Sequence, residues 1–523
     1  MTSIAQAFLA ALLLLPHHAR AKAADPVEVT WRKAGLESAL KEARAADKPL
    51  LVYWGAVWCP PCNALKAKAF HDPGFVKATR SFIPVYLDGD SEDAQAWGER
   101  LHASGYPTLL VLNSSGREVQ RLVTSDPLPD LIAEIERTRE DLSGWDGLLK
   151  KAALAKRPAD LLPAEWRRLA ARDWTGDERW IDREIELADQ LRAVGNAFPP
   201  EMVNERVRLE LAELRERVLV SSKDKKPLAE SERKRGLALV RGLLSDPELV
   251  AVHAMPLAFL SGDLVRAAFP GETPSAERTD FIKHYLTAFR AYRKRPGLSL
   301  ENRLYSTEPF TELTAGLKAA GVPLALEEAN DLANEAITEL ANAKTEQQVI
   351  VVLNSLADLL GSIGRPAEGQ KHILENLARV SSKNELMSTL AELEEKQGHP
   401  AEALRWTEKA YRETVGKNSR LQWGVRYVRY LIEHEPKGHG RIEATSHELL
   451  TDSVKRTDSF SGRNLRSLNR LAKALKGWSS AEKVKLADEK AIGLAGFSCT
   501  RSGLNPESRA RCEALLREMA VAI

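Results

Sequence analysis

Hydrophobic and polar positions follow two different patterns along the chain. Up to about residue 138, short apolar runs alternate with amphipathic stretches. The apolar runs have the length of buried strands, and the amphipathic stretches place apolar residues at helical spacing. This pattern predicts a small mixed-sheet α/β domain over residues 25–140. We expect strands at 49–55, 82–89, 107–112 and 117–123, and helices at 36–48, 59–70, 91–103 and from 127 onwards.

From about residue 143 the strand pattern stops, and one amphipathic helix follows another. At 523 residues the chain is too long for one hydrophobic core. We therefore predict a multidomain protein in which the α/β domain precedes an all-α solenoid. The solenoid divides into a helical region at 143–340, a repeat region at 341–415 and a C-terminal helical region at 416–523.

The repeat region contains two stretches that align when shifted by 34 residues. The matches include Leu356 on Leu390, Ala357 on Ala391, Gly364 on Gly398 and Pro366 on Pro400. This period, with a glycine between two helices, resembles tetratricopeptide repeats. Such solenoids present a concave surface suited to peptides or helices.

The N-terminus begins MTSIAQAFLAALLLLPHHARAKAAD, with an apolar run from Ala7 to Leu15 and small residues before a possible cleavage site. The run is too short to span a bilayer but fits a secretory signal. We expect residues 1–23 to be removed on export to the periplasm; the alternative is an apolar helix of the folded domain. No other stretch approaches about 18 apolar residues, so we expect no membrane span after signal removal.

Charge argues against one class of partner. The chain carries 75 Lys and Arg against 73 Asp and Glu, a net charge of +2. A nucleic-acid backbone requires a large surplus of basic charge, so we expect no nucleic-acid partner.

Four cysteines form two local pairs, Cys59 with Cys62 and Cys499 with Cys512. For the first pair we considered a zinc half-site, a structural disulfide and a redox couple. Zinc would need a second pair of ligands, and His71 and His102 are single, so we predict no metal. A disulfide across two residues removes little entropy from the unfolded chain, which makes a poor structural link.

The redox interpretation fits the local pattern best. Cys59 follows a strand at the start of a helix, where free amides and the helix dipole favour a thiolate. Cys62 lies in the first turn, placed to attack a mixed disulfide formed by Cys59. The two cysteines are therefore the candidate catalytic residues.

The stretch Trp58-Cys59-Pro60-Pro61-Cys62, with Tyr106-Pro107-Thr108 later in the chain, resembles the thioredoxin superfamily. The similarity covers about residues 30–140. It is strongest to the C-terminal thioredoxin-like domain of periplasmic thiol:disulfide interchange proteins, whose membrane helices are absent here. The resemblance implies a thioredoxin fold, Cys59 as attacking thiol, Cys62 as resolving thiol and a cis Pro107. Trp58, Tyr106 and Pro107 are expected to contact substrate, and no cofactor is expected.

Pro60 and Pro61 favour one direction of electron flow. Both suit the first turn of a helix, where a missing N–H breaks no bond. Each also removes a possible donor to the Cys59 sulfur, so the thiol should be less acidic than in a strong oxidant. The dithiol should then be the better reductant. We predict a reductase rather than an oxidase.

One position departs from the thioredoxin pattern. Thioredoxin has a buried acid six residues before the first cysteine, and here that residue is Tyr53. A phenol is a poor base at neutral pH. We therefore expect either slower resolution by Cys62 or assistance from another group, such as Glu118 or a water molecule.

Cys499 and Cys512 enclose a loop, and a disulfide there could stabilise the fold by about 3 kcal/mol. We predict a structural disulfide, with free thiols or a second redox pair as alternatives.

Two functions stay open. The first is an exported thiol:disulfide oxidoreductase that reduces protein disulfides, receives electrons from a membrane or periplasmic donor, and binds its clients through the helical domain. The alternative is a helical scaffold or adaptor in which the thioredoxin-like module mainly docks and thiol exchange is incidental.

Overall fold

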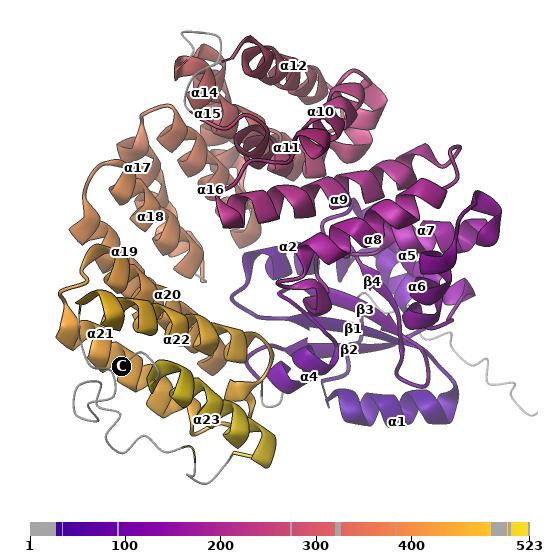
Figure 1. The fold of residues 1–523 in the computed structure, drawn as a ribbon, viewed down its shortest axis with the longest axis horizontal. Coiled ribbons are helices and arrows are strands. Elements are labelled where there is room, and N and C mark those ends of the chain that lie inside the picture. Colours follow the sequence, from indigo (N-terminus) through magenta and orange to yellow (C-terminus); the bar gives the residue numbers. More distant parts are fainter. Residues whose placement is uncertain are drawn as a thin grey trace, which may run out of the picture.

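The computed structural model describes residues 28–520 except 34, 92–93, 272–274, 320–325, 382, 483–498 and 500–503. The expected leader at residues 1–23 lies outside the described residues. The described chain forms an N-terminal α/β domain followed by a large all-helical region (Figure 1). This confirms the predicted fold class.

The α/β domain is built on four strands, β1 (Leu50–Gly55), β2 (Ile83–Asp88), β3 (Thr108–Leu112) and β4 (Glu118–Leu122). Their order in the sheet is β2-β1-β3-β4, with β1 parallel to β2 and antiparallel to β3, and β3 antiparallel to β4. The register pairs Trp54 with Leu87 on one side and with Thr108 on the other. All four strands lie within the predicted ranges.

Alternating residues of β1 supply two hydrophobic cores. Leu51 and Tyr53 face a core shared with α2 (Pro60–Ala69), α3 (Pro73–Thr79) and α5 (Leu128–Glu140). Val52 and Trp54 face the opposite core, which includes α1 (Leu36–Ala46) and residues beside α4 (Ala94–Arg100). Side chains of a strand alternate between faces, so helices cover both faces of this sheet.

The helical region begins at α6 and continues to α23. Its α-helices are α6 (Trp145–Leu154), α7 (Pro163–Ala171), α8 (Glu184–Ala197), α9 (Val203–Asp224), α10 (Glu230–Leu244), α11 (Pro247–Ala268), α12 (Ala276–Arg293), α13 (Leu300–Tyr305), α14 (Glu308–Ala319), α15 (Leu326–Asn342), α16 (Glu346–Ser362), α17 (Pro366–Asn376), α18 (Asn384–Lys396), α19 (Pro400–Arg412), α20 (Lys417–His434), α21 (His439–Ser453), α22 (Gly462–Glu482) and α23 (Pro506–Ala520).

These helices curve around the α/β domain and return to it (Figure 1). Helix α6 contacts β4, α16 contacts α2, and α22 contacts α4. The helical region therefore meets the α/β domain at its beginning, middle and end. The contact with α2 is the one that matters for the cysteines, because α2 begins directly after Cys59.

Two helical hairpins repeat with the spacing seen in the sequence. Helices α17 and α19 begin at Pro366 and Pro400, 34 residues apart. The turns before them contain Gly364 and Gly398, with φ of 82° and 79°. A positive φ favours glycine, which explains why both turns carry one.

Helix α11 is long and apolar enough to cross a membrane, judged by length and composition among the described residues. More than half of its most apolar window is nevertheless buried inside the molecule. It contacts α9, α10, α12 and α14. We interpret it as the core helix of this part of the protein.

The start of the helical region is fixed to the edge strand β4 by buried arginines. Arg121 donates to the carbonyl oxygens of Leu101 (2.8 Å) and Gly176 (3.0 Å), and its side chain is fully buried. Arg172 forms an ion pair with Glu118 at 2.7 Å. Hydrogen bonds to buried charged groups are among the strong ones, so these contacts stabilise the junction.

Candidate functional site

The two cysteines lie where β1 gives way to α2. Cys59 is the N-cap of α2, and its sulfur accepts a hydrogen bond from the Cys62 backbone N–H at 3.3 Å. Prolines occupy the first positions of the helix, as expected for residues whose missing N–H breaks no bond. Both cysteines are free thiols here, with 4% of Cys59 and 0% of Cys62 exposed.

The two thiols act on each other's acidity. Burial raises the pKa of the Cys59 thiol far above its ordinary value, and the neighbouring Cys62 raises it further. Burial also opposes ionisation of Cys62, but the Cys59 thiol, the Ala56 backbone and Tyr53 together lower the pKa of Cys62. The pair therefore loses its first proton more easily than its second.

Two tyrosines and a lysine form a cluster next to Cys62. The ring of Tyr53 stacks on Tyr86 with centroids 5.2 Å apart, and the Lys66 ammonium lies 5.3 Å from the Tyr86 ring centre. Burial and the thiols raise the pKa of Tyr53 well above its usual range. The Tyr53 hydroxyl thus stays protonated and cannot serve as a base for Cys62.

Glu118 is not the missing base either. It begins β4 and pairs with Leu112, which lies opposite Leu50 at the start of β1, whereas the cysteines follow the end of β1. Although burial opposes its ionisation, Arg172 and neighbouring arginines lower the pKa of Glu118. Our suggestion that Glu118 assists Cys62 was wrong, because this carboxylate belongs to the junction at the other end of the sheet.

Trp58 and Tyr106 pack against the hydrophobic core that contains both cysteines, and Pro107 follows Tyr106 directly before β3. The Tyr106-Pro107 peptide bond is cis and precedes β3. The Tyr106 ring meets the Trp58 ring edge to face at 6.0 Å, and its hydroxyl accepts a hydrogen bond from Gln95 at 2.7 Å. A Cβ at Gly89 would lie 2.1 Å from this hydroxyl, so only glycine fits there. All three predicted substrate-binding residues remain partly exposed.

Asp90 joins this site to the helical region. One carboxylate oxygen accepts from the Trp58 indole N–H at 2.9 Å and from the Ser419 hydroxyl at 2.7 Å. The other accepts from the backbone N–H groups of Asn418 and Ser419, both at 3.0 Å. A carboxylate in this position caps the N-terminus of α20 from outside its own chain segment. Sequence reasoning missed Asp90, since nothing local links it to residues 328 positions away.

Arg463 is a second residue that the sequence did not reveal. It lies in the first turn of α22, and its guanidinium lies 4.1 Å from the centre of the Tyr106 ring. The charge of Arg463 also favours the Cys59 thiolate. The helical region therefore contributes a cation to the surroundings of the dithiol.

Cys499 and Cys512 form a disulfide, with both residues buried. It ties α23 to the segment before it. The adjacent Arg511 donates to both carboxylate oxygens of Glu99 in α4, at 2.7 and 2.8 Å. The disulfide thus lies directly beside a contact between the C-terminal helix and the α/β domain.

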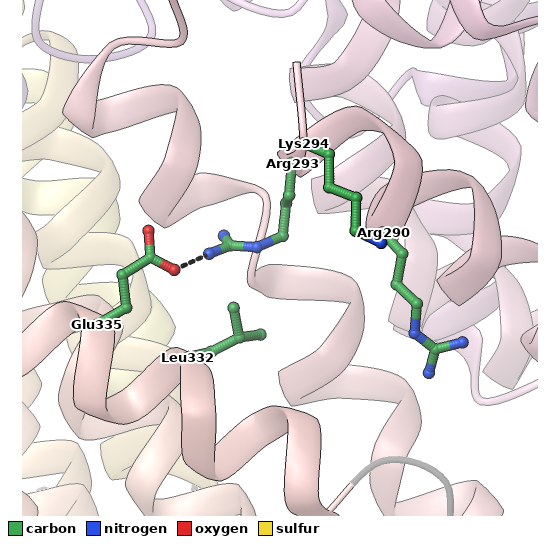
Figure 2. Close-up of a pocket in the computed structure, with 5 residues that line it drawn as sticks. All are labelled: Arg290, Arg293, Lys294, Leu332 and Glu335. Atoms are coloured by element: carbon green, nitrogen blue, oxygen red, sulfur yellow. Dashed lines mark hydrogen bonds and ion pairs between the residues drawn. The ribbon is translucent and has the colours of Figure 1, made fainter. Parts of the chain in front are cut away.

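A separate pocket of about 260 Å³ lies between α12 and α15 (Figure 2). It is lined by Arg290, Arg293, Lys294, Leu332 and Glu335, and Arg293 forms a 2.6 Å ion pair with Glu335. No cysteine lines it, so it is unrelated to the dithiol. Within the described ranges, no group of three or more His, Cys, Asp or Glu is placed to hold a metal ion.

Comparison with known proteins supports a thioredoxin-like domain. Residues 30–114 match the Thioredoxin-like family. Among solved structures, a thioredoxin from Thermus thermophilus is similar at 24% identity with a TM-score of 0.20, over 21% of this chain and 86% of that one. A search of curated proteins finds no match. The cysteine pair therefore lies in a thioredoxin-like domain, and most of the helical region lies outside the matched residues.

Proposed function

We propose that this protein is a thiol:disulfide oxidoreductase that reduces protein disulfides. The observation that carries the proposal is the Cys59–Cys62 geometry, in which the first sulfur caps α2 and accepts the backbone N–H of the second cysteine. The Cys62 backbone N–H favours a thiolate at this sulfur, while burial opposes it. The thioredoxin-like domain around it supports the same chemistry.

The reaction proceeds in two exchanges. The Cys59 thiolate attacks one sulfur of a client disulfide, which forms a Cys59–client disulfide and releases the other client sulfur as a thiolate that takes up a proton. Cys62, once deprotonated, attacks the Cys59 sulfur, forms the Cys59–Cys62 disulfide and releases the second client thiol. Two electrons and two protons pass to the client, and an external dithiol donor restores the protein's dithiol.

We infer that reduction is the favoured direction, and we base this on Cys59, because the pKa of Cys62 is lowered. Burial raises the pKa of Cys59, and a first cysteine of low acidity stabilises the disulfide relative to the dithiol. We place the reaction in the periplasm, after export, with a membrane or periplasmic donor. The apolar N-terminal run and the resemblance to interchange proteins support this location.

The helical region is proposed to bind the client. Its hairpins resemble tetratricopeptide repeats, and α16 of the first hairpin contacts α2 beside the dithiol. A client segment held by these helices would have a raised effective concentration at Cys59. No cofactor is needed for the exchange.

Reduction of insulin disulfides by the full-length protein, with dithiothreitol as electron donor, tests the function. The protein should accelerate the reaction over dithiothreitol alone, and Cys59→Ser should abolish the acceleration. Cys62→Ser should accumulate a covalent complex with the client, because its Cys59 cannot be released by a resolving thiol. Catalysis that survives Cys59→Ser would contradict the proposal.

The adaptor function remains the second candidate, favoured by the low exposure of Cys59, only 4%. A thiol enclosed by its own protein is suited to a docking module whose chemistry is incidental. The two functions differ in what they require of Cys59. An adaptor would keep its partners after Cys59→Ser, whereas an oxidoreductase would lose its activity.

A further inference from the structure

Helix α11 is apolar on the side that it exposes as well as on the side that it buries. Four apolar residues lie on the exposed side at the spacing of one helix face, namely Val252, Met255, Pro256 and Phe259. Val252 is 56% exposed and Phe259 is 52% exposed. We call these four residues the α11 face. Contiguous exposed apolar residues on a folded protein mark an interaction site.

The α11 face ends at a group of carboxyl side chains on α14. The Tyr305 ring, at the end of α13, packs against Phe259 with ring centroids 5.6 Å apart. One turn further along α11, Gly262 lies so close to the Glu312 carboxylate that it has no room for a side chain. An apolar surface is therefore followed, along the same helix, by an acidic one.

The carboxyl groups at this end are short of positive charge. Arg266 donates to Glu312 at 2.8 Å. Glu308 lies four residues earlier, on the same side of α14, and no described residue forms a hydrogen bond or an ion pair with it. Burial and the nearby Asp358 and Glu312 raise the pKa of Glu308 to about 7, and burial raises that of Asp358 to about 6 although Lys396 opposes this. An added cation would stabilise carboxylates that now repel one another.

The acidic end of this surface is connected to the helix of the dithiol. Asp358 belongs to α16, which contacts both α14 and α2. Helix α2 begins directly after Cys59. A client segment held against α11 and α14 would thus be bound by helices that share a neighbour with the active-site helix.

We propose that the α11 face, together with Glu308 and Asp358, is a client-binding surface for a segment that carries apolar side chains next to Lys or Arg. The inference rests on the proposed reductase function and deepens it, because it names the class of client. The apolar side chains of the segment cover Val252 and Phe259, and its basic side chain supplies the cation that Glu308 lacks. The carboxylates repel the anionic surface of a membrane, which disfavours a lipid occupant.

The probe is a short fluorescein-labelled peptide in which Leu alternates with Lys and which contains no cysteine. Its binding to the full-length protein is measured by fluorescence anisotropy and compared with that of a peptide carrying Glu in place of Lys. We expect the Glu peptide to bind at least about tenfold more weakly than the Lys peptide. Phe259→Ser and Val252→Ser should each weaken binding of the Lys peptide by about fivefold or more, and Glu308→Gln should weaken it several-fold.

Two variants serve as matched controls. Leu374→Ser changes an apolar side chain of α17 that is 50% exposed, and Glu136→Gln removes an exposed carboxylate from α5. Both should bind the Lys peptide like the unmodified protein, and circular dichroism melting should show all variants folded.

Equal binding of the two peptides, or unchanged binding in both Phe259→Ser and Val252→Ser, would overturn the proposal. Sedimentation velocity distinguishes a second copy of this chain: a dimer that dissociates in Phe259→Ser would show that another copy covers the α11 face, and would also overturn it. Peptide binding without insulin reduction would reject only the reductase function, whereas insulin reduction without peptide binding would reject only this surface.

Discussion

The indole N–H of Trp58 donates to the carboxylate of Asp90 at 2.9 Å, and this carboxylate also binds the helical region. The same carboxylate accepts hydrogen bonds from the backbone N–H groups of Asn418 and Ser419, at the N-terminus of α20, and from the Ser419 hydroxyl. Movement of α20 away from the α/β domain would therefore leave the Asp90 carboxylate bound to Trp58 but without its partners in the helical region. Trp58 and the N-terminus of α20 are thus held by one side chain.

Replacing Asp90 with Ala should loosen the contact between α20 and the α/β domain beside Cys59. The change removes four hydrogen bonds to a carboxylate and leaves a helix N-terminus without its cap, so we expect a loss of about 3 kcal/mol in the free energy of unfolding. Because local opening becomes easier, alkylation of Cys59 by iodoacetamide should accelerate more than tenfold at constant pH. Urea titration and alkylation kinetics measure the two effects.

The control for Asp90 is Asp224→Ala, which removes an exposed carboxylate from the end of α9. It should change neither quantity appreciably. If Asp90→Ala lowers stability but leaves the alkylation rate at the original value, the Asp90 contacts do not govern access to Cys59.

The Cys499–Cys512 disulfide should stabilise the fold. It closes a loop with a sequence separation of 13, so replacing both cysteines with Ala should lower the free energy of unfolding by about 3 kcal/mol. The loss should also release α23 and its Arg511–Glu99 contact with the α/β domain. Urea unfolding under oxidising conditions measures the difference.

Dithiothreitol provides the internal control for the disulfide. Once the reductant has opened the bond in the unmodified protein, that protein and the double-Ala variant should unfold at similar urea concentrations. Equal stability of the two proteins before reduction would refute a stabilising role.

His253 should make stability depend on pH in the acid range. It is 1% exposed at a kink in α11, and burial, aided by the charge of Arg208, lowers its pKa to about 4. Between about pH 6.5 and 4 the unfolded chain binds a proton that the folded chain does not. Stability should therefore fall by about 3 kcal/mol as the pH drops through this range.

The variant His253→Gln removes this titration, so its stability should fall less over the same range. His71→Gln, which changes an exposed histidine, is the matched control. Parallel pH profiles for His253→Gln and the unmodified protein, measured by urea unfolding, would disprove the contribution of His253.

The features predicted from sequence are those encoded by neighbouring residues. The four strands follow from apolar runs, and the placement of Cys59 at the start of α2 follows from a strand followed by two prolines. Helix α3 was missed as a separate element although its signal is local. Asp72 caps it, with its carboxylate accepting the Phe75 N–H, and Pro73 begins it.

The parts that could not be predicted depend on contacts between distant segments. Asp90 meets Asn418 across 328 residues, and Arg463 reaches Tyr106 from a helix with an ordinary amphipathic pattern. Neither residue belongs to a motif, and periodicity reports only which face of a helix is buried.

A half-buried carboxylate in the helical region should have the opposite pH effect to His253. Burial and the nearby Asp358 and Glu312 raise the pKa of Glu308 to about 7, and burial raises that of Asp358 to about 6. The unfolded chain releases the Glu308 proton near its ordinary pKa, whereas the folded chain retains it up to about pH 7. Stability should therefore fall as the pH rises from about 4.5 to 7.

Glu308→Gln removes the cost of ionising this side chain. Because the residue is partly exposed, we expect a modest gain of about 1–2 kcal/mol at pH 8 and little change at pH 4. Glu136→Gln in α5, where the carboxylate is exposed, should give no such gain. A Glu308→Gln protein that is less stable than the original at pH 8 would mean that the ionised carboxylate is favourable there, and that the burial of Glu308 does not penalise its charge.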